Sequence, residues 1–433
     1  MTLTIILAVV TFVLLILSIV FLPKIKVGKL NISTYWLVAL FGAILMLSTL
    51  RVSFKEVGDA LFSNSNSMNP IKILALFFSM TFMSIFLEEA GFFKWLASVA
   101  VRKAKQSQLV LFVILYFLTA ALTIVTSNDI VILTFTPFIC YFCKNAKINP
   151  LPYLIAEFAA ANTWSMMLII GNPTNMYLGA NAGINFGEYF KVMAIPTLVA
   201  GVVEFGLILL IFRKSLSQKM ECDSEVIPVG NKLDVIAGLT CLGVCIVLLA
   251  ISNYINVPMW LVSVCVAGAL LVYFVVTRLI RKNIKKSTCV IGKSLPWALI
   301  PFVISMFIIV ISLQKQGVSG EIAKVLGNTN TIWTYGPSSF VFANLINNIP
   351  MSILYSTLPT FSGTEYYRAI YASIIGSNIG AFLTPIGALA GIMFTGLLKD
   401  HEVKLSFKDF SKYGIIIALP TCAVALVMLM IML

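Results

Sequence analysis

The chain has 433 residues, of which 60% are hydrophobic and only 11% are charged. Soluble domains are about half apolar and a quarter charged, so this composition excludes both an ordinary water-soluble enzyme and a disordered chain. The formal net charge is +13, from 30 Lys and Arg against 17 Asp and Glu. The basic residues lie in short loops between apolar segments, which is the positive-inside pattern of a membrane protein and does not indicate a nucleic-acid partner.

Taken in chain order, ten segments are apolar and long enough to cross a lipid bilayer, which takes about 20 residues. They are residues 3–22, 33–50, 72–90, 151–180, 192–212, 233–252, 257–277, 295–313, 365–398 and 413–433. The first segment lacks a basic start and a small-residue cleavage site, so we expect a retained span rather than a signal peptide. Residues 92–101 are predicted to form an interfacial amphipathic helix.

Two further apolar stretches, 108–143 and 332–360, are too long for one span. Their centres are polar, with Thr126, Ser127, Asn128 and Asp129 in the first and Asn347 and Asn348 in the second. Lys and Arg flank the first stretch on both sides, as expected of a segment that returns to the side it left. We therefore predict two re-entrant hairpins in a multi-pass protein of the cell (inner) membrane, with both termini external.

A polar linker at residues 215–232 divides the chain near its middle. Each side holds five predicted spans and one hairpin, and because five is odd, two similar halves must be inverted. We expect an all-α polytopic membrane protein of two inverted repeats, 1–214 and 233–433. Each repeat has one broken helix, at 151–180 and 365–398. The equal spacing from Asn162 to Gly171 and from Asn378 to Gly387 agrees with this.

Four polar clusters fall inside the predicted membrane zone, at matched places in the two halves. Irregular backbone is tolerated there only where it is buried in protein or lines a cavity. A single cluster could be helix-kink chemistry alone, but four matched ones favour an ion pathway. The candidate binding residues are Ser127, Asn128, Asp129, Asn172, Thr174, Asn175, Asn347, Asn348, Ser377, Asn378 and Thr384. The candidate helix breaks are Gly171, Pro173, Gly380, Pro385 and Gly387.

Carboxylates inside the predicted spans and hairpins are few. Asp129 is the candidate for proton coupling or cation binding, because an intramembrane carboxylate is costly and sits here at a hairpin tip. The alternative is a carboxylate that caps local amides. Glu157 and Glu204 are expected to make structural bonds between helices. We expect Glu88 and Glu89, near an interface, to be solvated or to cap the amphipathic helix.

The remaining reactive residues indicate neither an enzyme nor a cofactor. Cys140 and Cys143 form a C-x-x-C run that could suit a soft metal or arsenic(III), but no further ligands accompany it, so ordinary packing is expected. The only histidine, His401, lies in a charged loop. Without a histidine in the spans, a His-based triad or an all-His metal centre is excluded, and the phosphate-binding G-x-x-x-x-G-K-[ST] pattern is absent.

Several of these motifs resemble one known group of proteins. They are Ser127-Asn128-Asp129 leading into Thr136-Pro137, Asn347-Asn348-Ile349-Pro350, Gly376-Ser377-Asn378-Ile379-Gly380 and Leu383-Thr384-Pro385-Ile386-Gly387. Across nearly its whole length the chain resembles the ion-transporter superfamily, which includes arsenite efflux permeases, divalent-anion/sodium symporters and certain sodium/proton antiporters. The arsenite permeases are the nearest. Residues 171–175 depart from the Ser-Asn-x-x-Asn expected of permeases, and Asn162 stands where an acidic residue is expected.

The resemblance implies a secondary active exporter of arsenite or antimonite in exchange for protons. In that mechanism a domain of both hairpins and both broken helices slides against a scaffold of the other spans. Asp129 would repel a di- or tricarboxylate but suits a proton-coupled site for a neutral solute. A sodium-coupled anion transporter and a sodium/proton antiporter remain as alternatives. A homodimer and a cytoplasmic ATPase subunit are partners that the sequence leaves open.

Overall fold

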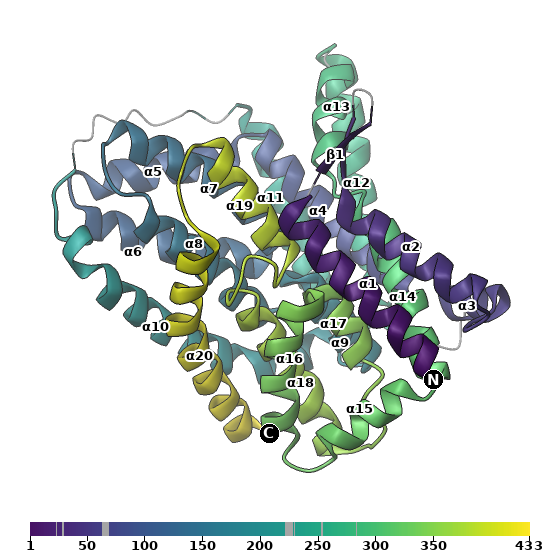
Figure 1. Cartoon of the computed structure of the whole chain (residues 1–433). Coiled ribbons are helices and arrows are strands. Elements are labelled where there is room, and N and C mark those ends of the chain that lie inside the picture. Colours follow the sequence, from purple (N-terminus) through teal and green to yellow (C-terminus); the bar gives the residue numbers. More distant parts are fainter. Residues whose placement is uncertain are drawn as a thin grey trace.

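The protein, described by a computed structural model, is almost entirely helical (Figure 1). The structure describes residues 1–22, 24–27, 30–62, 69–220, 228, 230–252, 254–282 and 284–433. The predicted all-α membrane fold is confirmed. Within the described ranges there is one small sheet, in which β1 (Lys24–Val27) pairs antiparallel with β2 (Leu30–Ser33).

The helices that precede the predicted linker account for most of the first half. They are α1 (Thr2–Phe21), α2 (Thr34–Ser48), α3 (Phe54–Phe62), α4 (Pro70–Glu89), α5 (Phe92–Ala104), α6 (Gln108–Val125), α7 (Asn128–Asn145), α8 (Leu151–Trp164), α9 (Pro173–Asn181) and α10 (Phe186–Leu216). Two 3₁₀ turns, η1 (Ser165–Met167) and η2 (Ile169–Gly171), lie between α8 and α9.

The second half has a similar series of helices. They are α11 (Lys232–Ile251), α12 (Met259–Ile280), α13 (Ile284–Ser294), α14 (Leu299–Lys315), α15 (Val318–Leu326), α16 (Thr331–Ile346), α17 (Asn348–Tyr355), α18 (Thr364–Gly380), α19 (Leu389–Asp400) and α20 (Phe407–Met432). Residues 221–227 and 229 of the predicted linker lie outside the described residues.

Several helix starts are fixed by side-chain caps. Asn69 accepts a hydrogen bond from the backbone N–H of Lys72 (2.9 Å), and Pro70 occupies the first turn of α4, where a missing N–H costs nothing. Asn185 and Glu188 form a reciprocal capping box at the start of α10. These polar caps begin helices whose interiors are mostly apolar.

Eight helices in the described part of the chain are long and apolar enough to cross a membrane. Two predicted spans, 151–180 and 365–398, are instead divided into shorter helices, and α2 has only 15 residues. The hairpin arm α6, with 18 residues, is itself as long as a span. Apolar side chains such as Leu210, Val247 and Val272 are about 60% exposed, which suits a surface covered by lipid.

The elements α6–α10 and α16–α20 follow the same order in the two halves. Each series contains a helix pair with a polar turn, an interrupted helix and a long closing helix with an internal proline, Pro196 or Pro420. The closing helices α10 and α20 pack against each other, whereas α2 packs on α14 and α4 on α12. The inverted relation of the halves stays a prediction.

Figure 1 shows two groups of helices with parts of the hairpins and of the interrupted helices between them. α5, α6 and α10 lie on the left, α1, α2 and α14 on the right, and α9, α16, α17 and α18 between them. Glycine allows the close contact of α16 with α18, since a Cβ added at Gly376 would lie 2.2 Å from the carbonyl oxygen of Gly336. Both termini lie at the same end of the molecule.

Candidate substrate and ion site

The first interruption separates α8 from α9. Helix α8 ends at Trp164, the two 3₁₀ turns follow, and the side chain of Asn172 caps α9 by accepting from the N–H of Thr174 (3.1 Å). Pro173 occupies the first position of α9. Only glycine fits at Gly171, because an added Cβ would lie 2.2 Å from the carbonyl oxygen of Ser165.

The second interruption separates α18 from α19. Helix α18 ends at Gly380 and α19 begins at Leu389, with a series of turns that contains Pro385 and Gly387 between them. The side chain of Asn344, on α16, donates to the freed carbonyl oxygen of Gly380 (2.8 Å). Thr384 donates in turn to the side-chain oxygen of Asn344 (2.7 Å). Side chains thus replace the hydrogen bonds that the broken helix lacks.

Asn378 joins the two interruptions at the centre of the molecule. Its side-chain oxygen accepts from Nδ2 of Asn172 (3.0 Å) and from the hydroxyl of Ser165 (3.1 Å), and its own Nδ2 donates to Oδ1 of Asn175 (2.7 Å). The hydroxyl of Ser377 lies 3.4 Å from that of Thr174. We call these six residues the amide cluster: Ser165, Asn172, Thr174, Asn175, Ser377 and Asn378. All are 0–1% exposed and none is ionisable.

The first hairpin turns at residues 126–127, between α6 and α7. Asn128 donates to the side-chain oxygen of Asn162 on α8 (3.3 Å). The backbone oxygen of Asn162 accepts from Ser165 (2.7 Å), which connects this turn to the amide cluster. The hydroxyl of Ser127 and the side-chain oxygen of Asn128 are buried without a hydrogen-bond partner. Such groups are costly to bury unsatisfied, so they are candidates to bind a ligand, a cation or water.

Asp129 follows Asn128 in the first turn of α7. It is half-buried and makes no hydrogen bond or ion pair with any described residue. Tyr35 of α2 lies within electrostatic reach of the carboxylate. Of the two interpretations of Asp129, capping of the local amides is therefore not observed, and the carboxylate has no counter-ion among the described residues.

The second hairpin turns at Asn347, between α16 and α17. This residue has φ of 73°, in the left-handed region that non-glycine residues rarely adopt. Its side chain donates to the carbonyl oxygen of Ile386 (3.2 Å), while the N–H of Asn348 donates to the carbonyl oxygen of Gly387 (3.0 Å). The second hairpin is thus fastened to the second interruption.

The sequence-predicted residues fall into three neighbouring groups rather than one. The amide cluster holds five of them, the first hairpin turn holds Ser127, Asn128 and Asp129, and the second turn holds Asn347, Asn348 and Thr384. Sequence reasoning did not select Ser165 or Asn344, and it used Asn162 only as a mark of the repeat. A signal was present, because Asn344 lies three residues before Asn347, and Ser165 lies three residues after Asn162 in the same apolar segment.

Two of the buried carboxylates outside these groups, Glu157 and Glu204, bond neighbouring helices, as expected. Glu157 of α8 accepts from the hydroxyl of Thr136 on α7 (3.0 Å). Glu204 of α10 accepts from the hydroxyls of Tyr116 on α6 (3.0 Å) and Thr163 on α8. Cys140 and Cys143 are buried free thiols, and the described residues contain no group of His, Cys, Asp and Glu that could hold a metal ion.

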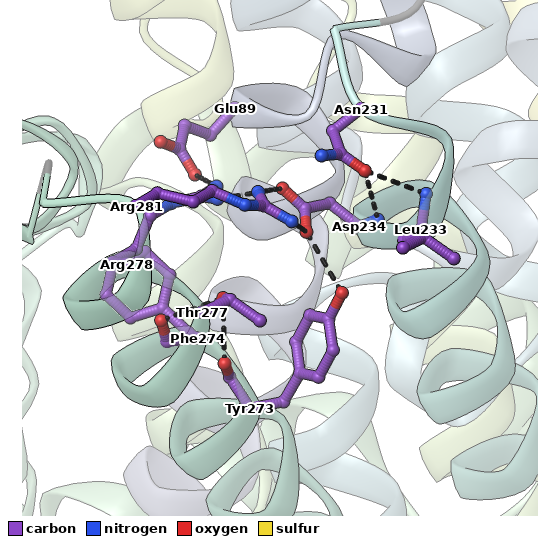
Figure 2. A network of polar contacts seen from close by, with 9 residues as sticks. All are labelled: Glu89, Asn231, Leu233, Asp234, Tyr273, Phe274, Thr277, Arg278 and Arg281. Atoms are coloured by element: carbon purple, nitrogen blue, oxygen red, sulfur yellow. Dashed lines mark hydrogen bonds and ion pairs between the residues drawn. The ribbon is translucent and has the colours of Figure 1, made fainter.

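The interpretation of Glu89 as a solvated or capping residue is wrong. Its carboxylate forms an ion pair with Arg278 (2.7 Å), which also pairs with Asp234 (2.8 Å). Arg281 and the hydroxyl of Tyr273 contact Asp234 as well (Figure 2). These five residues form the ionic cluster, which ties α4, α11 and α12 together. The sequence missed it because its partners come from different helices.

Comparisons with known proteins give a consistent result. Residues 12–374 match the family described as citrate transporter. An arsenical pump membrane protein of Escherichia coli K12 is 27% identical over 366 residues, which cover 81% of this chain and 84% of that protein. A putative arsenical pump membrane protein of Bacillus subtilis is 26% identical over 425 residues, covering 88% and 90%.

The fold is also found in a solved structure. The YdaH transporter of Alcanivorax borkumensis matches with a TM-score of 0.53 and 14% identity, covering 99% of this chain and 97% of that one. At this identity the likeness concerns the fold alone. Together these matches confirm the resemblance that the sequence motifs predicted.

Proposed function

The chain belongs to the citrate transporter family of membrane transporters, and from this premise we propose that it is a secondary active exporter of arsenite or antimonite driven by proton influx. The proposal goes beyond the family, whose printed description names citrate. It rests on the chemistry of the three polar groups described above and on relatives that are named arsenical pumps.

The absence of charged side chains from the amide cluster is the observation that carries the substrate proposal. Its six residues offer amide and hydroxyl donors and acceptors but no cationic side chain. Arsenous and antimonous acids are neutral trihydroxides near pH 7, so they suit such a lining. A citrate trianion would favour Arg or Lys partners, because charge-assisted bonds are the strong ones.

Asp129 is the proposed proton carrier. Its carboxylate has no counter-ion among the described residues, so uptake of a proton would remove the only formal charge at the first hairpin turn. Loss of that charge would lower the cost of moving α7 past α2, where Tyr35 lies. Proton binding and movement of the hairpin would therefore be coupled.

The movement that we propose is of the elevator type. Both hairpins and both interrupted helices would move as one body, because hydrogen bonds join them through Asn162, Asn378 and Asn344. The remaining long helices would form the scaffold. The ionic cluster, which connects α4, α11 and α12, would hold that scaffold together.

A sodium-coupled di- or tricarboxylate transporter is the second candidate. The family description favours it, and so do the two unpartnered oxygens of Ser127 and Asn128, since Na⁺ prefers neutral and anionic oxygen ligands. The first turns of α9 and α17 also present backbone N–H groups, which attract anions. A sodium/proton antiporter would use the same oxygens without an organic substrate.

Flux in proteoliposomes separates these candidates. The purified chain is reconstituted, a pH gradient or a sodium gradient is imposed, and the uptake of arsenite, antimonite, citrate and succinate is followed. We expect arsenite flux driven by the pH gradient alone. Carboxylate flux that requires sodium would favour the second candidate, and sodium/proton exchange without either solute would favour the antiporter.

Replacement of Asp129 by Asn tests the proton carrier. We expect Asp129→Asn to lose at least about tenfold of the proton-driven arsenite flux and to lose its pH dependence, because the amide cannot take up a proton at neutral pH. The matched control is Asp59→Asn, which neutralises an exposed carboxylate on α3 and should transport normally. An unchanged pH response in Asp129→Asn would exclude this residue as the carrier.

Topology and assembly are part of the proposal. We place both termini on the external face of the cell membrane, which agrees with their position at one end of the molecule (Figure 1). Labelling of single cysteines added at the two ends, in intact cells, tests the orientation. Light scattering of the purified protein tests the proposed homodimer, and co-purification tests a cytoplasmic ATPase partner.

A further inference from the structure

A basic groove lies at the end of the molecule where the loops are predicted to be cytoplasmic. It is formed by the end of α5, the turn into α6 and the residues that follow α10, and it encloses about 990 Å³. Four cations line it: Arg102, Lys103, Lys105 and Lys219. None of the lining residues is acidic, and none of the four cations forms an ion pair with a described residue.

Backbone contacts hold the groove in shape. Ser107 and Lys219 form a β-bridge, and the N–H of Met220 donates to the carbonyl oxygen of Gln106 (3.0 Å). Lys105 has φ of 52°, a conformation that favours glycine, and yet it carries a long cationic side chain. The turn that carries Lys105 is therefore fastened to the segment that carries Lys219.

The walls of the groove are apolar where they meet the membrane-spanning helices. Val101 and Leu216 are buried, whereas Leu109 and Val110, in the first turn of the apolar helix α6, are each 42% exposed. The groove thus has cations at its mouth and an apolar surface that continues along a span. A ligand with an anionic head and an acyl tail complements both parts.

We propose that this groove binds an anionic phospholipid, with the headgroup phosphate among Arg102, Lys105 and Lys219 and an acyl chain along α6. Basic pockets at the cytoplasmic ends of spans attract anionic headgroups, and the positive-inside pattern puts this groove on that side. The bound lipid would join the start of the first hairpin to the end of α10. The inference requires a membrane protein but not the proposed substrate.

Native mass spectrometry of the full chain in detergent tests the proposal. The protein is titrated with phosphatidylglycerol, cardiolipin and phosphatidylcholine, and the fraction with bound lipid is measured. We expect the two anionic lipids to bind at least tenfold more tightly than phosphatidylcholine. The triple variant Arg102→Gln/Lys105→Gln/Lys219→Gln should lose this preference.

The matched control removes the same charge elsewhere. Lys399→Gln/Lys404→Gln/Lys408→Gln neutralises three exposed lysines of another loop that is predicted to be cytoplasmic, and it should bind as the unaltered chain does. Equal loss in both triple variants would mean that general charge attracts the lipid, and it would overturn a specific site. If the groove variant is not monodisperse, Lys105→Gln and Lys219→Gln are measured singly, and unchanged affinity in both overturns the proposal.

Two further measurements test whether something other than a lipid fills the groove. Displacement of lipid by millimolar inorganic phosphate would identify a site for the free anion and overturn the lipid proposal, whereas no displacement supports it. Glu221→Gln/Asp223→Asn/Glu225→Gln neutralises the acidic residues of the linker. Lipid binding to that variant alone would identify the linker as the occupant of the groove and would overturn the lipid proposal. Equal binding to the variant and to the unaltered chain supports the lipid proposal.

Discussion

The amide cluster and the ionic cluster are both buried polar networks in an apolar protein, but they are built from opposite chemistry. The amide cluster contains no ionisable group, and its side chains are 0–1% exposed. The ionic cluster pairs two carboxylates with two guanidinium groups, of which Arg281 retains 29% side-chain exposure. The first lies where two interrupted helices meet, and the second lies at helix ends.

The difference shows where charge is tolerated in this fold. Carboxylates and guanidinium groups at helix ends can stay near water and balance one another, which limits the desolvation cost. Between interrupted helices, neutral amides satisfy freed carbonyl and N–H groups without a charge to desolvate. A network of neutral amides can also exchange partners at low cost, which suits a site that must bind and release a solute.

The largest expected effect comes from unbalancing the ionic cluster. Asp234→Asn leaves Arg278 with Glu89 as its carboxylate partner and leaves Arg281 with none among the described residues, and breaking a buried pair typically costs about 3–5 kcal/mol. We expect a clear fall in the thermal unfolding midpoint of the protein in detergent. The measurement is fluorescence-detected size-exclusion chromatography after heating.

A paired change and a surface control sharpen that result. Asp234→Asn combined with Arg281→Gln restores the charge balance and should recover part of the lost stability. Glu321→Gln removes an exposed carboxylate that pairs with Lys324, and it should change the midpoint little. If Asp234→Asn unfolds at the same temperature as Glu321→Gln, the ionic cluster does not stabilise the scaffold.

A substitution in the amide cluster should lower the stability of the protein less than one in the ionic cluster, but it should lower transport more. Asn378→Ala removes partners from Ser165, Asn172 and Asn175, and unsatisfied buried groups cost about 1–3 kcal/mol. We expect a smaller fall in the unfolding midpoint than for Asp234→Asn, together with at least about tenfold less flux in proteoliposomes. The two clusters would then differ in which property they control.

Asn145→Ala is the matched control for Asn378→Ala. Asn145 is an exposed residue at the end of α7, so its replacement should alter neither the unfolding midpoint nor the flux. Full flux in Asn378→Ala would place the substrate outside the amide cluster. The proposed site would then have to be moved to the hairpin turns.

The smallest effect is expected at the surface pair of Glu56 and Lys315. The Lys315 ammonium (2.7 Å), together with hydrogen bonds from Ser53, lowers the pKa of Glu56 from its ordinary value of 4.5 to about 2. The stabilisation is therefore present above pH 4.5 and is lost as the pH falls through about 2. Glu56→Gln should lower the unfolding midpoint slightly at pH 7, and less as the pH falls. A constant difference would contradict the assignment.

The sequence predicted the helices and their interruptions from local signals. Apolar length marks spans such as α1 and α20, Gly171 and Gly387 lie in the two interruptions between helices, and Pro173 begins the helix after the first one. These signals depend on residues a few positions apart, so they can be read without the fold. The chemical class of the site follows from the same signals, because Asn, Ser and Thr gather at the interruptions.

Pairing between distant residues could not be predicted in the same way. Asn172 and Asn378 are 206 residues apart, and Glu89 and Arg278 are 189 apart. Many Asn, Ser and charged residues could satisfy the same bonding needs, and only the packing of the helices selects the partners that meet. The sequence alone therefore determined that this chain crosses a membrane on helices with polar interruptions. Which amides face one another, and where the carboxylates and guanidinium groups balance, was decided by the tertiary structure, because partners this far apart are brought within bonding distance only by helix packing.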